Sequence, residues 1–191
     1  MGRYLVIAAW ATVVAVALAI FAARHSAPFQ KPLNLELAAQ DIASRSPSQS
    51  VWKWVAVHVL DPRCSCSDKV LSLLSQNKED DVRHIVLLLS PASEALREQL
   101  QAQKVEIWQS SPEEARKLFH IETVPWFVLL DRQLQVKYSG GYAADKIRTA
   151  SDVKLKEIIN TIRSDKAVAA LPSYGCVTSE ELRKRLLMGS P

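Results

Sequence analysis

Two nearly uninterrupted apolar runs constrain this fold more than any other feature of the sequence. They are VWKWVAVHVL at residues 51–60 and VRHIVLLLS at residues 82–90. Runs of this length and composition are typical of strands buried on both faces, as in parallel sheets covered by helices. A helical pattern follows each run, beginning at Ser67 or Asp68 after the first and at Ser93 after the second. We therefore expect βαβ units built around a parallel sheet.

The later segments complete an α/β fold with a mixed central sheet flanked by helices. Ser111 and Pro112 begin a helix with acidic residues in its first turn. Two apolar strands joined by a short polar turn then predict an antiparallel hairpin. The elements expected after residue 90 are a strand at 105–108, a helix at 112–120, strands at 126–130 and 134–138, and a helix at 154–162. The ordered domain is expected to span residues 51–165.

The N-terminal segment predicts a membrane anchor. Residues 4–23 carry no charge and lie between Arg3 and Arg24. A helix of this length, at about 1.5 Å per residue, spans the apolar core of a bilayer. A cleaved signal peptide is the alternative, because a small-x-small cleavage pattern lies inside the run. We expect residues 1–24 to be an uncleaved signal anchor and residues 25–50 a linker, with the domain on the periplasmic or extracytoplasmic side of the cytoplasmic membrane.

Charge and cysteine content narrow the class of function. The 24 Lys and Arg residues against 20 Asp and Glu residues give a net charge of +4, and the basic residues are scattered along the chain. A nucleic-acid-binding surface would need them to cluster. Three cysteines are too few to build a disulfide scaffold. We therefore expect the two cysteines that lie close together in the sequence to be functional rather than structural.

The motif DPRCSCS joins the first strand to the first helix and carries Cys64 and Cys66 with one residue between them. Thiol chemistry needs a thiolate, and both a helix N-terminus and a neighbouring cation such as Arg63 lower the pKa of a thiol. We therefore expect Cys64 to attack and Cys66 to resolve the resulting mixed disulfide. A disulfide closed across one residue is strained and hence oxidising, which suits exchange or isomerisation.

With two later motifs, this cysteine pair resembles the thioredoxin-like superfamily, specifically its membrane-anchored TlpA/ResA-like branch. The later motifs are EEARKLFHIETVPWFVLLD, where Val-Pro precedes a strand, and the GGY that follows the hairpin. The resemblance implies a cis Pro125 against the attacking sulfur and a Val124 whose backbone binds a partner chain. That family has two residues between its cysteines, so the resolving position falls here on Ser67. The resemblance also implies thiol–disulfide exchange with extracytoplasmic proteins and no cofactor.

Two other functions stay open. Cys64, Cys66 and Cys176 are a candidate ligand set for copper or zinc, as in a metallochaperone. Alternatively, the domain is a binding module whose cysteines no longer turn over. Cys176 lies in a C-terminal tail at residues 166–191, before a short helix that Thr178 is expected to cap. In that tail it is a third ligand, a resolving thiol or a free cysteine.

Overall fold

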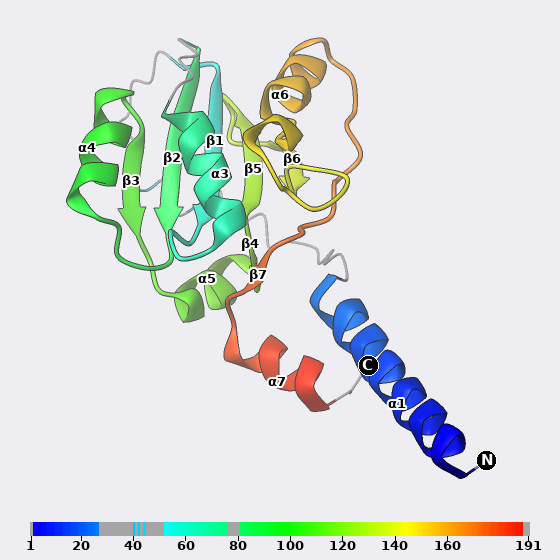
Figure 1. Ribbon diagram of the computed structural model, residues 1–191. Helices are drawn as coiled ribbons and strands as arrows, with labels where there is room; N and C mark the ends of the chain where they lie inside the picture. Colours follow the sequence, from blue (N-terminus) through cyan, green and yellow to red (C-terminus); the bar gives the residue numbers. More distant parts are fainter. Residues whose placement is uncertain are drawn as a thin grey trace.

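A five-stranded mixed sheet forms the centre of the protein. Its strands are β1 (Trp54–Leu60), β2 (Val82–Leu88), β3 (Glu106–Gln109), β5 (Trp126–Asp131) and β6 (Val136–Gly140). Figure 1 shows them in the computed structural model, which describes residues 2–26, 40, 42, 44, 52–75 and 81–188. The order is β3-β2-β1-β5-β6, with β1 to β3 parallel and β5 and β6 antiparallel to their neighbours. The predicted α/β class and mixed sheet are confirmed, in the arrangement of a thioredoxin-like fold.

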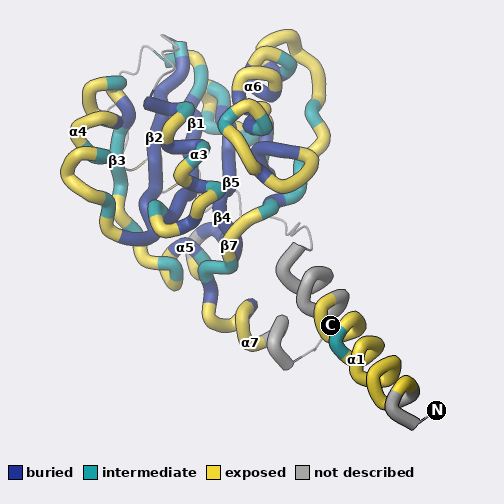
Figure 2. The backbone as a smooth tube through the Cα atoms, in the orientation of Figure 1, coloured by how far each residue is buried: buried dark blue, intermediate teal, exposed yellow. Residues whose placement is uncertain are grey.

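The central strand β1 is buried on both faces, as its apolar sequence predicts. Ala56 and Leu60 belong to a core cluster on one face of the sheet, and Val57 and Val59 belong to a second cluster on the other face. Figure 2 shows burial concentrated in β1, β2 and β5, with exposed residues on the outer sides of the helices. The covering helices are α3 (Ser65–Leu74), α4 (Glu94–Ala102), α5 (Pro112–Phe119) and α6 (Leu155–Arg163).

Helices α4 and α5 begin where the sequence predicts N-caps, whereas α3 begins earlier than predicted, with Cys64 rather than Ser67 or Asp68 as its N-cap residue. The Ser93 hydroxyl accepts a hydrogen bond from the backbone N–H of Leu96 and so caps α4. Ser111 and Glu114 form a reciprocal capping box at the start of α5, with Pro112 as the first helical residue. α5 and α6 pack on opposite faces of the sheet, α5 in the cluster of Val57 and α6 in that of Ala56. The predicted order of strands and helices is therefore confirmed from β1 to α6.

The β5–β6 hairpin forms without a glycine in its turn. The Asp131 carboxylate accepts hydrogen bonds from the backbone N–H groups of Gln133 and Gln135, each at 2.9 Å. Leu134 takes the left-handed conformation, with φ of 59°. The aspartate side chain thus replaces part of the backbone pairing that a glycine-containing turn would make.

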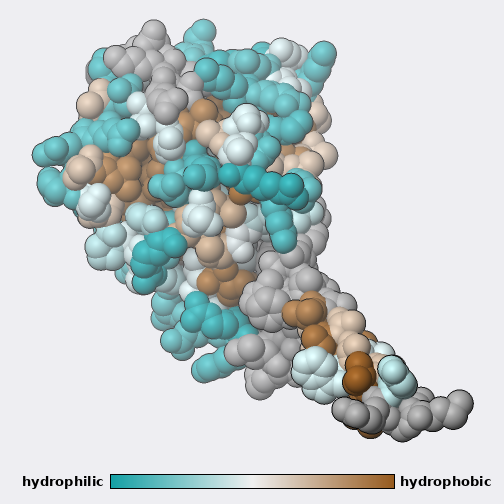
Figure 3. Space-filling view, in the orientation of Figure 1, coloured by the Kyte–Doolittle hydropathy of each residue, from teal (hydrophilic) through white to brown (hydrophobic). Residues whose placement is uncertain are grey.

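The N-terminal segment forms a helix, α1 (Gly2–Ser26). Large apolar side chains are exposed along it, among them Tyr4, Ile7 and Trp10 (Figure 3). Within the described ranges, however, no helix is both long and apolar enough to cross a membrane. The membrane span predicted for residues 4–23 is therefore not confirmed, and most of the predicted linker at 25–50 lies outside the described residues.

The C-terminal tail contributes a small second sheet that the sequence did not predict. Its strands, β4 (Thr123–Val124) and β7 (Cys176–Val177), pair antiparallel. After β7 the tail forms α7 (Glu180–Met188). Outside the tail, a short 3-10 helix, η1 (Ala150–Asp152), precedes α6. The predicted cap of the terminal helix was wrong by one residue: Ser179, not Thr178, accepts the hydrogen bond from the backbone N–H of Leu182 at 3.0 Å.

Candidate thiol–disulfide site

Cys64 lies at the junction between β1 and α3. After β1 the chain turns, and the N–H of Cys64 donates to the carbonyl oxygen of Asp61 at 2.9 Å. Cys64 is the N-cap residue of α3, and its own carbonyl oxygen accepts from the N–H of Asp68 at 3.0 Å. Its side chain is only 2% exposed. The sulfur is thus held at a helix N-terminus, a position whose partial positive charge favours negatively charged groups.

Asp61 and Arg63 fix the turn that presents Cys64. The Arg63 guanidinium donates to both carboxylate oxygens of Asp61, at 3.1 and 2.9 Å, and Ser90 donates to the same carboxylate. Burial alone would raise the pKa of the Asp61 carboxyl, but the hydrogen bonds from Arg63 and Ser90 outweigh it and lower that pKa. The cation predicted to act on Cys64 is therefore paired with Asp61, and its effect on the cysteine stays a prediction.

Pro125 follows a cis peptide bond, as the resemblance implied. The carbonyl oxygen of Val124 lies 3.9 Å from the sulfur of Cys64. Val124 is fully buried, and its backbone pairs with another strand through β4. That strand comes from the same chain, because Val124 is opposite Cys176 of β7.

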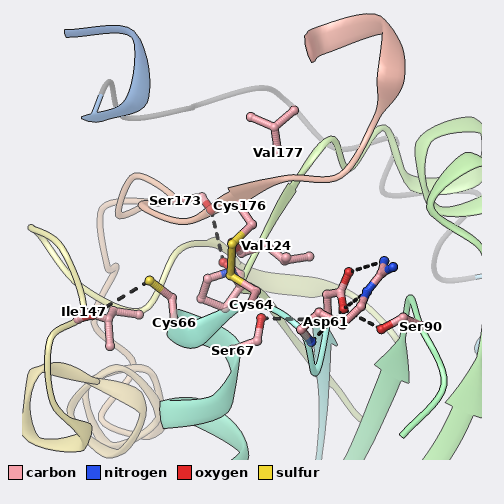
Figure 4. The surroundings of a disulfide bond; sticks show 12 residues. Asp61, Cys64, Cys66, Ser67, Ser90, Val124, Ile147, Ser173, Cys176 and Val177 are labelled. Carbon is pink, nitrogen blue, oxygen red and sulfur yellow. Dashed lines mark hydrogen bonds and ion pairs between the residues drawn. A yellow bond between two sulfur atoms is a disulfide. The ribbon is translucent and has the colours of Figure 1, made fainter. Parts of the chain in front are cut away.

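Cys176 is bonded to Cys64. The two residues form a disulfide with their Cα atoms 6.0 Å apart, across 112 residues of sequence. Figure 4 shows the tail strand crossing the start of α3, with the disulfide beneath it and Val124 beside it. The sequence left the role of Cys176 open. The structure bonds it to Cys64, the residue that the sequence predicted to attack.

Cys66 lies apart from this disulfide. Its side chain points away from Cys64 and donates a hydrogen bond to the carbonyl oxygen of Ile147 at 3.8 Å (Figure 4). Cys66 carries a free thiol, and burial raises the pKa of that thiol. The structure therefore does not pair the two cysteines of the C-x-C motif, and the resolving role predicted for Cys66 stays a prediction.

Several tail residues that shape the site were not singled out from the sequence. The Ser173 hydroxyl donates to the carbonyl oxygen of Pro125 at 3.2 Å, and the Ser179 hydroxyl donates to the Glu122 carboxylate at 3.1 Å. Gly175 lies so close to the carbonyl oxygen of Val124 that a Cβ would be 1.8 Å from it. A glycine directly before a lone distant cysteine is the one signal in the sequence that could have indicated a close approach of this segment.

The candidate metal ligands do not converge. Within the ranges that the structure describes, no three His, Cys, Asp or Glu side chains lie close enough together to hold a metal ion. Two of the three sulfurs proposed as ligands are joined in the disulfide, and the third, that of Cys66, is directed to Ile147. This arrangement of sulfurs is suited to disulfide chemistry.

Comparisons with known proteins concern the fold. No protein-family model and no curated protein matches the chain. An uncharacterized conserved protein from Geobacillus kaustophilus is similar at 16% identity and a TM-score of 0.54, over 66% of this chain and 77% of that one. Weaker matches include StoA from Bacillus subtilis, with 22% identity, a TM-score of 0.40, and 56% and 82% of the two chains covered. A thioredoxin-like protein from Aeropyrum pernix has 10% identity, a TM-score of 0.41, and 78% and 98% covered.

Sheet order, strand directions and the cis Val124–Pro125 bond thus agree with the thioredoxin-like fold expected from the sequence.

Proposed function

We propose that this protein carries out thiol–disulfide exchange with protein partners, with Cys64 as the attacking sulfur and Cys176 as its redox partner. The observation that carries the proposal is the Cys64–Cys176 disulfide, placed at the N-terminus of α3 and beside the strand edge of Val124. The exchange uses sulfur chemistry alone and needs no cofactor.

The environments of the three sulfurs support these roles. Cys64 is at a helix N-terminus, which stabilises a thiolate both as an attacking and as a leaving group. Cys66 is a poorer nucleophile at neutral pH, because burial raises the pKa of its thiol. Cys176 is exposed, whereas Cys64 is 2% exposed. We therefore expect a thiol from outside to approach the disulfide from the side of Cys176.

The cycle balances with these groups. The Cys64 thiolate attacks one sulfur of a partner disulfide, and the other partner sulfur leaves as a thiolate. Cys176 then attacks the Cys64 sulfur of the mixed disulfide, so that the partner is released with two thiols and the Cys64–Cys176 bond forms. Two electrons have passed from the protein to the partner. A dithiol restores the reduced form by attacking Cys176, with Cys64 as the leaving group, and the reverse sequence oxidises a partner dithiol.

We also propose that the domain works outside the cytoplasm, as expected for a protein anchored by residues 4–23. The proposal is supported by the uncharged N-terminal run and by the disulfide, since stable disulfides belong to oxidising compartments. Alkaline extraction of membranes and protease protection in intact and broken cells test it. Release into the soluble fraction, or digestion only after the cytoplasm is opened, would contradict it.

The exchange itself is tested by counting thiols in the purified full-length protein. The protein is equilibrated with reduced and oxidised dithiothreitol or glutathione, alkylated, and mapped by mass spectrometry. We expect two thiols to disappear reversibly, at Cys64 and Cys176, while Cys66 is alkylated in both states. Cys66→Ser serves as the matched control and should keep the same titration, whereas Cys64→Ser should abolish it.

Each alternative gives a different map. Recovery of a Cys64–Cys66 disulfide would replace Cys176 by Cys66 as the redox partner, as the C-x-C motif predicted. Absence of any reversible change in thiol content would overturn exchange chemistry altogether and favour the binding module.

A further inference from the structure

The tail lies on the site in the way that a bound partner segment would. β7 runs antiparallel to β4, with Val177 opposite Thr123 and Cys176 opposite Val124. This register places the sulfur of Cys176 within bonding distance of Cys64. Backbone pairing and a disulfide to Cys64 are the two contacts that any extended, cysteine-containing segment makes when it adds to this edge. The tail therefore shows what such a segment must satisfy.

The residue before the cysteine meets the strictest requirement. A Cβ on Gly175 would be 1.8 Å from the carbonyl oxygen of Val124 and 2.8 Å from Cδ of Pro125. Both atoms belong to fixed parts of the chain, a buried backbone and a proline ring, so neither can move aside as a flexible side chain would. Any residue other than glycine at this position forces the strand out of its register.

The tail has further contacts that a partner segment would not share. Upstream, Gly141 donates from its N–H to the carbonyl oxygen of Leu171 at 2.8 Å, and a Cβ on Gly141 would be 2.0 Å from the carbonyl oxygen of Pro172. Downstream, the N–H of Thr178 donates to the carbonyl oxygen of Glu122 at 2.8 Å. These contacts flank the disulfide on both sides and involve neither of its sulfurs. We therefore expect the tail to compete for the β4 edge even when the disulfide is reduced.

We propose that the edge formed by Thr123, Val124 and Pro125 selects partner segments in which a glycine directly precedes the reacting cysteine, and that the protein's own residues 173–177 occupy this edge in the oxidised resting form. The inference rests on the proposed exchange function and names its substrate class: extended Gly-Cys segments. In the productive complex the Cys64 thiolate attacks the cysteine sulfur of such a segment, a new S–S bond forms, and the sulfur previously bonded to that cysteine leaves as a thiolate.

Two synthetic peptides test the selection. The first is Leu-Pro-Ser-Tyr-Gly-Cys-Val-Thr, the sequence of residues 171–178. The second has alanine in place of the glycine. Each is activated as a mixed disulfide with thionitrobenzoate, whose release is followed by absorbance. The protein is the full-length Cys66→Ser, Cys176→Ser variant, so that Cys64 is the only sulfur left to react. Both peptides are calibrated against glutathione to remove differences in intrinsic reactivity.

We expect the glycine peptide to react with Cys64 at least about tenfold faster than the alanine peptide, because only the former adds to β4 in register. Adding Gly175→Ala to the protein should weaken the tail's hold on the edge. The rate should then rise for both peptides, with the ratio between them preserved. Because both peptides meet the same protein sample, partial unfolding of a variant cannot create the ratio.

The outcomes separate the two proposals. Equal rates for the two peptides, with Cys64 reacting, would overturn the glycine selection and leave the exchange function standing. A ratio that holds but rates that do not rise with Gly175→Ala would overturn the tail's competition for the edge when no disulfide holds it there. Release of thionitrobenzoate no faster than in a variant that also carries Cys64→Ser would overturn the exchange function itself.

Discussion

Removing the Cys64–Cys176 bond should cost several kcal/mol of stability. The bond joins residues 112 apart in sequence, so it closes a loop that includes most of the domain. Loop-closure entropy for about 100 residues amounts to roughly 4.7 kcal/mol at 25 °C. Cys176→Ser restores this entropy to the unfolded chain while the hydrogen bonds of the tail remain available to the folded one. We therefore expect the free energy of unfolding to fall by about 4 kcal/mol.

Urea denaturation of the full-length protein measures this difference. Tryptophan fluorescence is a suitable signal because Trp126 is buried in the second core cluster. With a slope of about 2 kcal/mol per molar urea, the midpoint of Cys176→Ser should lie about 2 M below that of the oxidised wild type. Wild type treated with a reductant should coincide with Cys176→Ser. The matched control is Cys66→Ser, which removes a thiol that donates a long hydrogen bond, 3.8 Å, to the carbonyl oxygen of Ile147, and should shift the midpoint little.

The size of the shift tests the reasoning about the tail. A tail that detaches on reduction gives the reduced folded state extra entropy, so the difference between the two forms becomes smaller than the loop-closure value. Equal midpoints for oxidised wild type and Cys176→Ser, with the disulfide verified by mass spectrometry, would refute the claim that this bond stabilises the protein by constraining the unfolded chain.

Other residues give sharper local tests. Ser179→Ala should lower the free energy of unfolding by about 1 kcal/mol, because it removes the cap of α7. Thr178→Ala should change it by less than about 0.5 kcal/mol, because within the described ranges the buried Thr178 hydroxyl has no hydrogen-bond partner. Equal effects of the two variants in urea denaturation would contradict this. Burial lowers the pKa of His84 to about 4. Because the folded state favours the neutral form, the contribution of His84 to the free energy of unfolding is fully present above pH about 6.5 and is lost as the pH falls toward 4. In denaturation curves measured across this pH range, His84→Gln should make the free energy of unfolding fall less steeply with decreasing pH. An unchanged pH dependence would contradict this. Ser67→Cys should form a disulfide with Cys64 that competes with the tail cysteine, detected by peptide mapping, and exclusive retention of the native bond would argue otherwise.

Much of the fold could be predicted because its signals are local. The apolar runs of β1 and β2 specify buried strands without reference to the rest of the chain. Ser93 and Ser111 begin helices through hydrogen bonds that reach only three residues along the chain. The position of Pro125 followed from a motif, and its cis bond agrees with the resemblance. Each of these features needs a short stretch of sequence and nothing else.

The tail could not be predicted in the same way. β7 has two residues, too few to show any hydrophobic periodicity, and its partner β4 is equally short. The bond between Cys64 and Cys176 joins residues 112 apart, and no spacing rule links them. The close approach of Gly175 to Val124 depends on tertiary structure, although the glycine itself is visible in the sequence. Long-range pairing of short segments is the part of this site that required the structure.

Helix geometry explains why the two nearby cysteines do not pair. Successive residues of an α-helix are rotated by about 100°, so residues two apart point to nearly opposite sides, whereas an N-cap residue and the third residue after it face each other. Cys64 is the N-cap of α3, and Cys66 accordingly points away to Ile147. The facing position belongs to Ser67, whose hydroxyl accepts a hydrogen bond from the N–H of Asp61 at 3.2 Å. With no sulfur at that position, a partner for Cys64 has to come from another part of the chain, and the strand that pairs with Val124 supplies it.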